Sequence, residues 1–421
     1  MPKRDTVDPI ASLRHRGFLI FLMGSFLSNV GNQMRFVTVS WEVWERTHSK
    51  LNLGYVGLVL ALPVILFALA AGTAADRYSR RTLVMIGQLG LSLCGMGLAW
   101  ASVTQAPLPF VYLLLWGTGT FRVIGWPASV AIVPGMVPTK TFPNATMWRS
   151  VMFHLAASLG PLLGGVLIAL WNPAIVYLLD ATSSLIMVGC LTFVRIQPHI
   201  RAVEPKSWLG FLQGVRFLRR QPIILSTMTL DMIAVLFGGA VAMLPVYATE
   251  VLNVGAIGYG WLRAMPALGA MFMGLLLAVR PPFRRGGHAL LAAVVAFGVA
   301  TLVFGVSQSF ALSLVALFVL GAADNISVVI RATVLQLLTP DSMRGRVTAV
   351  SVIFIETSNE IGAFESGVAA QWLGLVPSVV FGGTMTLVTV VVTAIIWPEL
   401  VRLGALEHLK PPDPGEAELS A

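Results

Sequence analysis

Twelve long apolar runs, separated by short polar turns, fill most of this sequence of 421 residues. A helix that crosses a bilayer needs about 20 mostly apolar residues, and each run has about that length. Only 11% of the residues are charged, against about 25% in a soluble domain. The chain is therefore expected to be an all-α polytopic membrane protein, with spans near 17–40, 54–75, 83–103, 108–133, 150–170, 173–194, 222–248, 256–279, 288–306, 310–333, 347–371 and 375–398.

Positive charge gathers at every second turn. Of the 28 Lys and Arg residues, 22 lie in seven segments, which are 1–17, 76–82, 134–149, 195–221, 280–287, 340–346 and 399–421. The intervening turns contain only Arg46 and Lys50. Because cytoplasmic loops are enriched in Lys and Arg, this alternation predicts a bacterial-type inner (plasma) membrane protein with both termini in the cytoplasm. The net charge of +9 follows from the same rule, so we expect these charges to face a lipid bilayer and not nucleic acid.

The basic segment 195–221 divides the runs into six and six. Within it, residues 208–218 have apolar side chains at helical spacing, which is typical of an amphipathic helix at a membrane surface. We expect a six-helix half at 1–194, a cytoplasmic linker at 195–221, a second six-helix half at 222–398 and a cytoplasmic tail at 399–421. Two such halves in parallel repeat, with a site between them at the midplane, are typical of transporters.

A charged motif follows the second span. It consists of Gly72, Asp76, Arg77, Arg80 and Arg81. The motif resembles the G-x-x-x-D-R-x-G-R-R signature of the major facilitator superfamily, with Ser79 in place of the usual Gly. The resemblance implies two six-helix pseudo-repeats, with Asp76 against the N-terminal end of the eleventh span. There the motif would act as a latch for the outward-facing state, and the alternative is a plain basic loop.

A second motif lies in the fifth span. It is formed by Gly160, Pro161, Gly164 and Gly165, and it resembles the G-P-x-x-G-G motif of facilitator antiporters. The resemblance implies export. The glycines allow another helix to approach closely and Pro161 kinks the span, so tight packing alone is the alternative. Further stretches at 31–41, 144–145 and 339–347 resemble the macrolide- and enterobactin-exporter branch of the superfamily.

Asp231 is predicted to lie near the bilayer centre, about ten residues into the seventh span. A charge there costs at least about 2.5–3.5 kcal/mol. Because proton coupling needs a carboxyl group that can be ionised or protonated, we expect Asp231 to couple protons or contact substrate. The alternative is a structural ion pair with one of the four arginines inside the spans, which are Arg35, Arg122, Arg263 and Arg331.

Glu356, Asn359 and Glu360 share one face of the eleventh span, because they are spaced i, i+3 and i+4. This stripe could bind a cationic substrate, relay protons or close a gate through an arginine. Packing against a partner arginine is the alternative.

Arg122 and Asp324 occupy equivalent positions in the two halves. They are therefore expected to face each other across a cavity, and an ion pair that forms in one state is a hypothesis. Arg331, seven residues after Asp324 on the same face, is the alternative partner.

Arg35 lies among amide side chains in the first span, which the resemblance places at the cavity together with the fourth, seventh and tenth spans. Arg35, Arg122, Asp324 and Arg331 are therefore further candidates for proton coupling or substrate contact. Asp180, in the more peripheral sixth span, is expected to be structural, with Ser183 or Ser184 as its hydrogen-bond partner.

These features favour a secondary active transporter, a proton-coupled exporter of a small amphiphilic molecule (drug or siderophore-like), working by alternating access. A lipid or lysolipid flippase, or an uptake permease, remains the alternative on the same fold. We expect a monomer. No cofactor or metal is expected, because the six His have no ligand spacing and Cys94 and Cys190 lie within spans. An enzyme is not expected, since the spans contain no nucleophile–base set. No nucleotide-binding loop is present, so ATP is not expected to be the direct energy source. The charge of the cargo stays open.

Overall fold

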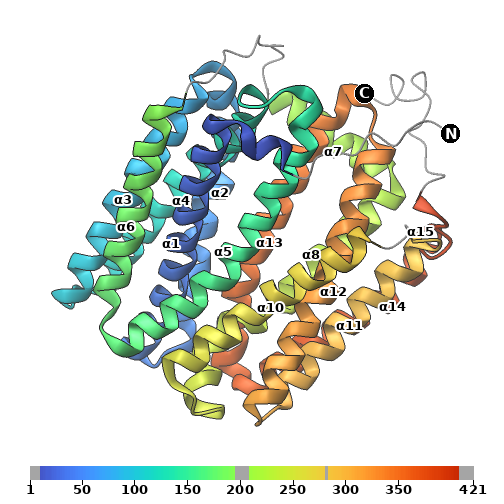
Figure 1. The fold of residues 1–421 in the computed structure, drawn as a ribbon. Coiled ribbons are helices and arrows are strands. Elements are labelled where there is room, and N and C mark those ends of the chain that lie inside the picture. Colours follow the sequence, from blue (N-terminus) through green and yellow to red (C-terminus); the bar gives the residue numbers. More distant parts are fainter. Residues whose placement is uncertain (1–9, 195–207, 280–282, 407–421) are drawn as a thin grey trace. The chain divides into compact units, whose positions relative to one another are not determined.

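The computed structural model describes residues 10–194, 208–279 and 283–406, and in these ranges the chain is almost entirely helical (Figure 1). The chain divides into two compact units. The first unit comprises Met1–Thr38 and Phe67–Pro205, and the second comprises Val39–Leu66 and Lys206–Ala421. Each unit is described by itself below.

The first unit is a bundle of long helices. Two of them, α1 (Arg16–Thr47) and α2 (Lys50–Arg77), continue into the second unit, and the others are α3 (Arg80–Val103), α4 (Leu108–Ala131), α5 (Phe142–Leu170) and α6 (Pro173–Phe193). Helix α3 packs along both α4 and α6 (Figure 1). One apolar core of this unit joins Phe18, Phe21 and Leu22 of α1 to Leu83 of α3 and Leu191 of α6.

The second unit is also helical. Its helices are α7 (Trp208–Arg220), α8 (Pro222–Phe237), α9 (Leu244–Val246), α10 (Gly255–Ala278), α11 (Gly286–Val306), α12 (Phe310–Leu338), α13 (Asp341–Leu373), α14 (Leu375–Ile396) and α15 (Pro398–Val401). Helix α12 packs against α10 and α11, and α11 also packs against α14 (Figure 1). This packing brings α8, α11 and α12 together around one apolar core.

The all-α architecture expected from the sequence is confirmed. In the described residues, ten helical segments are long and apolar enough to cross a membrane. The spans expected at 17–40 and 347–371 correspond to α1 and α13, which are 32 and 33 residues long and include more charged positions. Several helices begin earlier than expected, as α5 does at Phe142 instead of residue 150.

The seventh span differs from the expectation of one continuous helix over 222–248. Helix α8 ends at Phe237, and a 3-10 helix (Gly239–Met243), α9 and a π-helix (Tyr247–Val251) follow. Gly238 stands directly at the break, where an added Cβ would lie 2.6 Å from the Ala234 carbonyl oxygen and 2.6 Å from the Phe297 ring. Only a residue without a side chain fits between α8 and α11 at this point.

Helix α7 is the amphipathic helix expected in the linker, but its apolar face packs on the protein. Phe217 and Leu218 are 3% and 4% exposed and belong to the core of the second unit. Arg346 of α13 donates a hydrogen bond from Nη1 to Oε1 of Gln213 at 2.8 Å. Part of the apolar stripe that suggested a membrane-surface helix therefore packs on the second unit, whereas Leu212 stays exposed.

The compact units do not coincide with the two halves expected at 1–194 and 222–398, because Val39–Leu66 groups with the second unit. Trp44 donates from Nε1 to Oγ1 of Thr249 at 2.9 Å, and the Trp41 ring stacks on Tyr259 with centroids 5.7 Å apart. An added Cβ at Gly367 would lie 2.7 Å from the Gly54 Cα, so the α2 and α13 backbones nearly touch. The grouping into two six-helix halves stays a prediction.

Candidate functional site

A buried ion pair joins α8 to α12 in the second unit. Nη1 of Arg331 lies 2.5 Å from Oδ2 of Asp231, and the two side chains are 10% and 8% exposed. Arg331 also donates from Nε to Oγ of Ser327, one turn earlier on α12, at 3.3 Å. Two acceptors in different directions therefore fix the orientation of the guanidinium group.

Asp324 adds a second carboxyl group to this cluster. It lies two helical turns before Arg331 on α12, and it interacts electrostatically with both Arg331 and Asp231. Among the described residues it makes no hydrogen bond and no direct ion pair. One guanidinium group thus faces two carboxyl groups, of which only Asp231 contacts it directly. We refer to Asp231, Asp324 and Arg331 as the acidic cluster.

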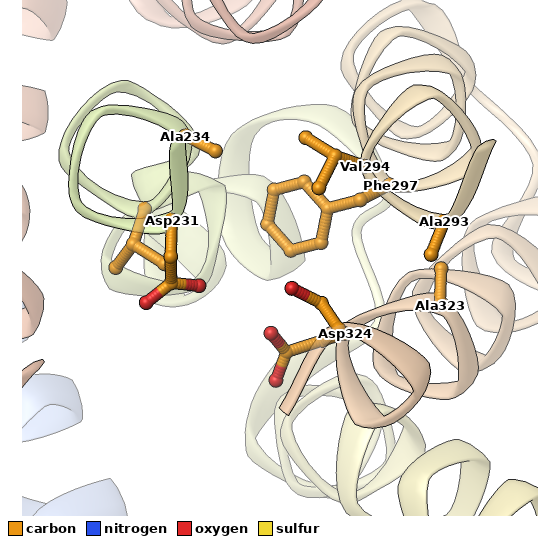
Figure 2. A pocket seen from close by; sticks show the side chains of 9 residues that line it. Asp231, Ala234, Ala293, Val294, Phe297, Ala323 and Asp324 are labelled. Carbon is orange, nitrogen blue, oxygen red and sulfur yellow. The ribbon is translucent and has the colours of Figure 1, made fainter. Parts of the chain in front are cut away.

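The two carboxyl groups of the acidic cluster face a small pocket (Figure 2). The side of the pocket opposite the carboxyl groups is apolar, and it is formed by Ala293, Val294 and Phe297 of α11. The cavity volume is about 10 Å³, which is roughly the room that one water molecule needs. Pockets for drug-sized ligands measure about 300–1,000 Å³, so this pocket suits water and protons and not a whole amphiphilic molecule.

The charges of the acidic cluster do not balance when all three groups are ionised. Two carboxylates and one guanidinium group then give a net charge of −1. An uncompensated charge is costly in a low-dielectric interior, and binding of one proton would make the cluster neutral. The arrangement can therefore bind and release one proton without losing the Asp231–Arg331 pair.

A second charged group of this unit was only partly foreseen from the sequence. Arg263 of α10 interacts electrostatically with Glu360 of α13 and with Tyr259, and Glu360 is 8% exposed. The sequence places Arg263 within a span but does not identify its partner. A buried arginine needs a counter-charge, and this need points to an acidic partner, but Glu360 is one of several acids that could supply it.

The three residues expected to form a stripe on α13 do not share one environment. Glu360 is buried, Glu356 is half-buried and Asn359 is exposed. Asn359 donates from Nδ2 to the Ile355 carbonyl oxygen of its own helix at 2.9 Å. A role of Glu356, Asn359 and Glu360 in substrate binding or proton transfer stays a prediction.

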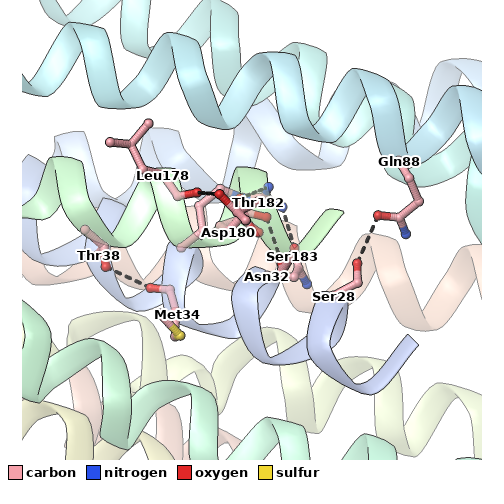
Figure 3. Close-up of polar contacts among 10 residues, drawn as sticks. Ser28, Asn32, Met34, Thr38, Gln88, Leu178, Asp180, Thr182 and Ser183 are labelled. Carbon is pink, nitrogen blue, oxygen red and sulfur yellow. Dashed lines mark hydrogen bonds and ion pairs between the residues drawn. The ribbon is translucent and has the colours of Figure 1, made fainter. Parts of the chain in front are cut away.

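The first unit contains its own buried ion pair, between Arg35 of α1 and Asp180 of α6. Figure 3 shows Asp180 together with Asn32 and Ser183, which lie around this pair. Nη1 of Arg35 lies 2.6 Å from Oδ2 of Asp180, with exposures of 3% and 1%, and Arg35 also donates to Asn32. Ser183 donates to the backbone carbonyl of Asp180 at 2.7 Å and not to its carboxylate. The partner of the Asp180 carboxylate is therefore Arg35, which favours a structural role for both residues.

The arginines after the second span contact carbonyl groups within the first unit. Arg80 donates to the Ala131 carbonyl oxygen at 2.6 Å, and Arg81 donates to that of Thr192 at 3.0 Å. Gly72 is buried and Arg77 is exposed at the end of α2. The side chain of Asp76 lies outside the part of the chain that is described, so the latch against the eleventh span stays a prediction.

The four residues of the fifth-span motif are all buried in α5, namely Gly160, Pro161, Gly164 and Gly165. An added Cβ at Gly160 would lie 2.5 Å from the Gln33 Cβ and 2.9 Å from the Val30 carbonyl oxygen, both on α1. The α1 and α5 backbones therefore approach closely here, and a role of this motif beyond packing stays a prediction.

Two further expectations concern pairing and metal binding. Arg122 is half-buried on α4. Its pairing with Asp324 stays a prediction, because the two residues belong to different units. Within the described ranges, no group of three or more His, Cys, Asp or Glu side chains is placed to bind a metal ion.

Comparison with known proteins places this site in context. A family model described as transmembrane secretion effector matches residues 7–413. The enterobactin exporters of Citrobacter koseri and Shigella boydii are each 25% identical to the chain, over 403 and 390 residues. These alignments cover 95% and 92% of this chain, and 95% and 93% of the exporters.

Solved structures show a similar fold. A bacterial homologue of the human lysosomal transporter Spinster gives a TM-score of 0.70 at 16% identity, over 95% of this chain and 99% of that one. A D-xylose–proton symporter gives a TM-score of 0.69 at 14% identity, over 91% and 98% of the two chains. At these identities the likeness concerns the fold alone.

Proposed function

We propose that this chain, which belongs to the transmembrane secretion effector family within the major facilitator superfamily, is a proton-coupled exporter of a small amphiphilic molecule. Membership of the family makes it a multi-pass membrane transporter and not an enzyme. The superfamily resemblance expected from the sequence is thereby confirmed. Three properties go beyond membership of the family, namely the direction of transport, the coupling ion and the class of cargo.

The direction of transport is proposed from two observations. The relatives aligned over nearly the whole chain are named as exporters, and the fifth span contains the motif that resembles that of facilitator antiporters. The cargo class is proposed from the same relatives, which are enterobactin exporters. At 25% identity only the class is carried over to this chain, as a drug-like or siderophore-like amphiphile.

The observation that supports proton coupling is the acidic cluster. Asp231 and Asp324 share one arginine beside a small pocket, in the interior of the second unit. Since one proton converts the cluster from a net charge of −1 to zero, protonation changes the electrostatic energy of this part of the unit. A change of charge that favours one conformation over another is what couples a proton gradient to a conformational cycle.

The cargo would bind elsewhere, because the pocket is smaller than drug-sized ligands require. Transport would follow an alternating-access cycle in which the two six-helix halves rock about a site between them. From the distribution of Lys and Arg, we propose a bacterial-type inner membrane protein with both termini in the cytoplasm. We also propose that it functions as a monomer.

The experiment that tests this function is cellular accumulation of a panel of dyes, macrolides and siderophores. Cells producing the wild type, Asp231→Asn or Asp324→Asn would be compared, each with and without a protonophore. Glu399→Gln is the matched control, because it changes an exposed carboxylate to an amide away from the acidic cluster.

Proton-driven export requires that the wild type and Glu399→Gln lower the accumulation of at least one compound. The protonophore and both cluster substitutions should abolish this effect. Export that is unaffected by the protonophore would refute proton coupling. Raised accumulation in wild-type cells would refute export in favour of uptake, and an unchanged panel together with flipping of a labelled lipid would replace the amphiphile with a lipid cargo.

A further inference from the structure

We propose that Asp324 is the carboxyl group that binds and releases the transported proton, whereas Asp231 stays ionised as the counter-charge of Arg331. This assignment rests on the proton coupling proposed above. It distinguishes two carboxyl groups that sequence position alone does not separate.

The contacts of Asp231 oppose its protonation. Its Oδ2 accepts a hydrogen bond from Arg331 at 2.5 Å, in a pair whose side chains are 10% and 8% exposed. Protonating Asp231 would replace a charge-assisted hydrogen bond with a weaker neutral one and remove the direct counter-charge of a buried guanidinium group. The pair also links α8 to α12, so its loss would weaken the contact between these helices.

The contacts of Asp324 do not oppose its protonation. Among the described residues it has no direct hydrogen bond or ion pair to lose, and its electrostatic partners are Arg331 and Asp231, one attractive and one repulsive. Figure 2 shows its carboxyl group facing the same pocket as that of Asp231. A proton can therefore reach Asp324 from the pocket while the Asp231–Arg331 pair stays intact.

The helices packed around α12 bring no other titratable group to the pocket in the described residues. Helix α8 contributes Asp231, and α11 contributes only Ala293, Val294 and Phe297. Tyr259 and Arg263 of α10 interact with each other, and Arg263 interacts with Glu360 of α13. On α12 itself, Arg331 and the hydroxyl group of Ser327 complete the surroundings.

The proton step is balanced. A hydronium ion gives its proton to a carboxylate oxygen of Asp324, forming an O–H bond and leaving water. The acidic cluster then has no net charge. On release the O–H bond breaks, the electron pair stays on the carboxylate and water on the other side of the membrane accepts the proton. Asp231 and Arg331 keep their charges throughout, so one proton is transferred per cycle.

The test uses infrared difference spectra of the purified full-length protein in lipid, recorded between two pH values. These spectra report the carbonyl stretch of protonated carboxylic acids, and they need no knowledge of the cargo. The variants are Asp324→Asn, Asp324→Glu and Asp231→Asn, with Glu399→Gln as the matched control. We expect a titrating carbonyl band in the wild type and the control that is lost in Asp324→Asn and returns at a shifted frequency in Asp324→Glu.

Loss of that band in Asp231→Asn, with its persistence in Asp324→Asn, would overturn the assignment and leave proton coupling at Asp231. A band that persists in both variants, or no titrating band in the wild type, would also overturn it. If Asp231→Asn does not fold, Asp324→Asn and Asp324→Glu decide the question alone. Protonophore-sensitive export is measured separately, so failure of the assignment and failure of the proposed function give different results.

Discussion

Nη1 of Arg331 lies 2.5 Å from Oδ2 of Asp231, so a buried ion pair connects α12 to α8 in the second unit. Asp324, on the same helix as Arg331, interacts with this pair electrostatically and without direct contact. The two carboxyl groups therefore differ in their contacts, and substitutions of the residues in the acidic cluster should have separable effects on stability and on proton coupling.

Arg331→Gln should destabilise the protein strongly. Removing one partner of a buried ion pair leaves the other charge uncompensated, at a cost of about 3–5 kcal/mol. The free energy of unfolding, measured by denaturing-detergent titration in mixed micelles, should fall by that amount. In the double variant Asp231→Asn/Arg331→Gln much of the loss should be recovered, but not transport. Equal losses in the single and double variants would show that the pair is not the cause.

Asp180→Asn should affect stability and not coupling. Asp180 is 1% exposed and paired with Arg35 in the first unit, so the substitution leaves a buried arginine without its counter-charge. We expect a loss of about 3–5 kcal/mol, with protonophore-sensitive export retained by the protein that reaches the membrane. Normal stability together with uncoupled export would instead place Asp180 on the proton pathway.

Gly160→Ala should separate α1 from α5. An added Cβ would lie 2.5 Å from the Gln33 Cβ, and overpacking of this kind costs about 1–3 kcal/mol. Gly189→Ala is the matched control in α6, because an added Cβ meets nothing there within 4 Å. The control should be neutral or more stable by up to about 1 kcal/mol, since Ala favours helix. Equal stability of the two variants would contradict the close approach.

Trp44 and Thr249 should show a measurable coupling energy. The indole Nε1 donates to the Thr249 hydroxyl group at 2.9 Å, and a hydrogen bond of this kind contributes about 1 kcal/mol. In a double-mutant cycle of Trp44→Phe and Thr249→Val, the two losses should not add, and the difference should be about 1 kcal/mol. Additive losses would show that segment 39–66 does not depend on this bond for its attachment to the second unit.

The helices were predictable from the sequence, because a bilayer requires long apolar segments whatever their neighbours are. The break after Phe237 was not predicted, although Gly238 and Gly239 follow it directly and glycine is common just after a helix end. The contact of the Phe297 ring of α11 with Gly238 joins distant segments and has no local sequence signal. The grouping of residues 39–66 with the second unit likewise depends on contacts such as that of Trp44 with Thr249.

The candidate site was predictable as a set of residues but not as a set of pairs. Asp231, Asp324 and Arg331 were all singled out because charge is rare within spans. The sequence left open whether Arg331 would pair with Asp324, on its own helix, or with Asp231. That choice depends on how α8 and α12 are rotated toward each other. The pairing of Arg35 with Asp180 depends in the same way on how α1 and α6 are rotated.

The most direct test of proton-coupled export is cargo-dependent proton flux across proteoliposomes containing the full-length protein. A pH-sensitive dye inside the vesicles would report protons while a cargo identified in the cellular panel moves down its own gradient, without a pH gradient. We expect proton movement opposite to the cargo in the wild type and in Glu399→Gln, and none in Asp324→Asn. Cargo movement without proton movement in the wild type would contradict proton-coupled export.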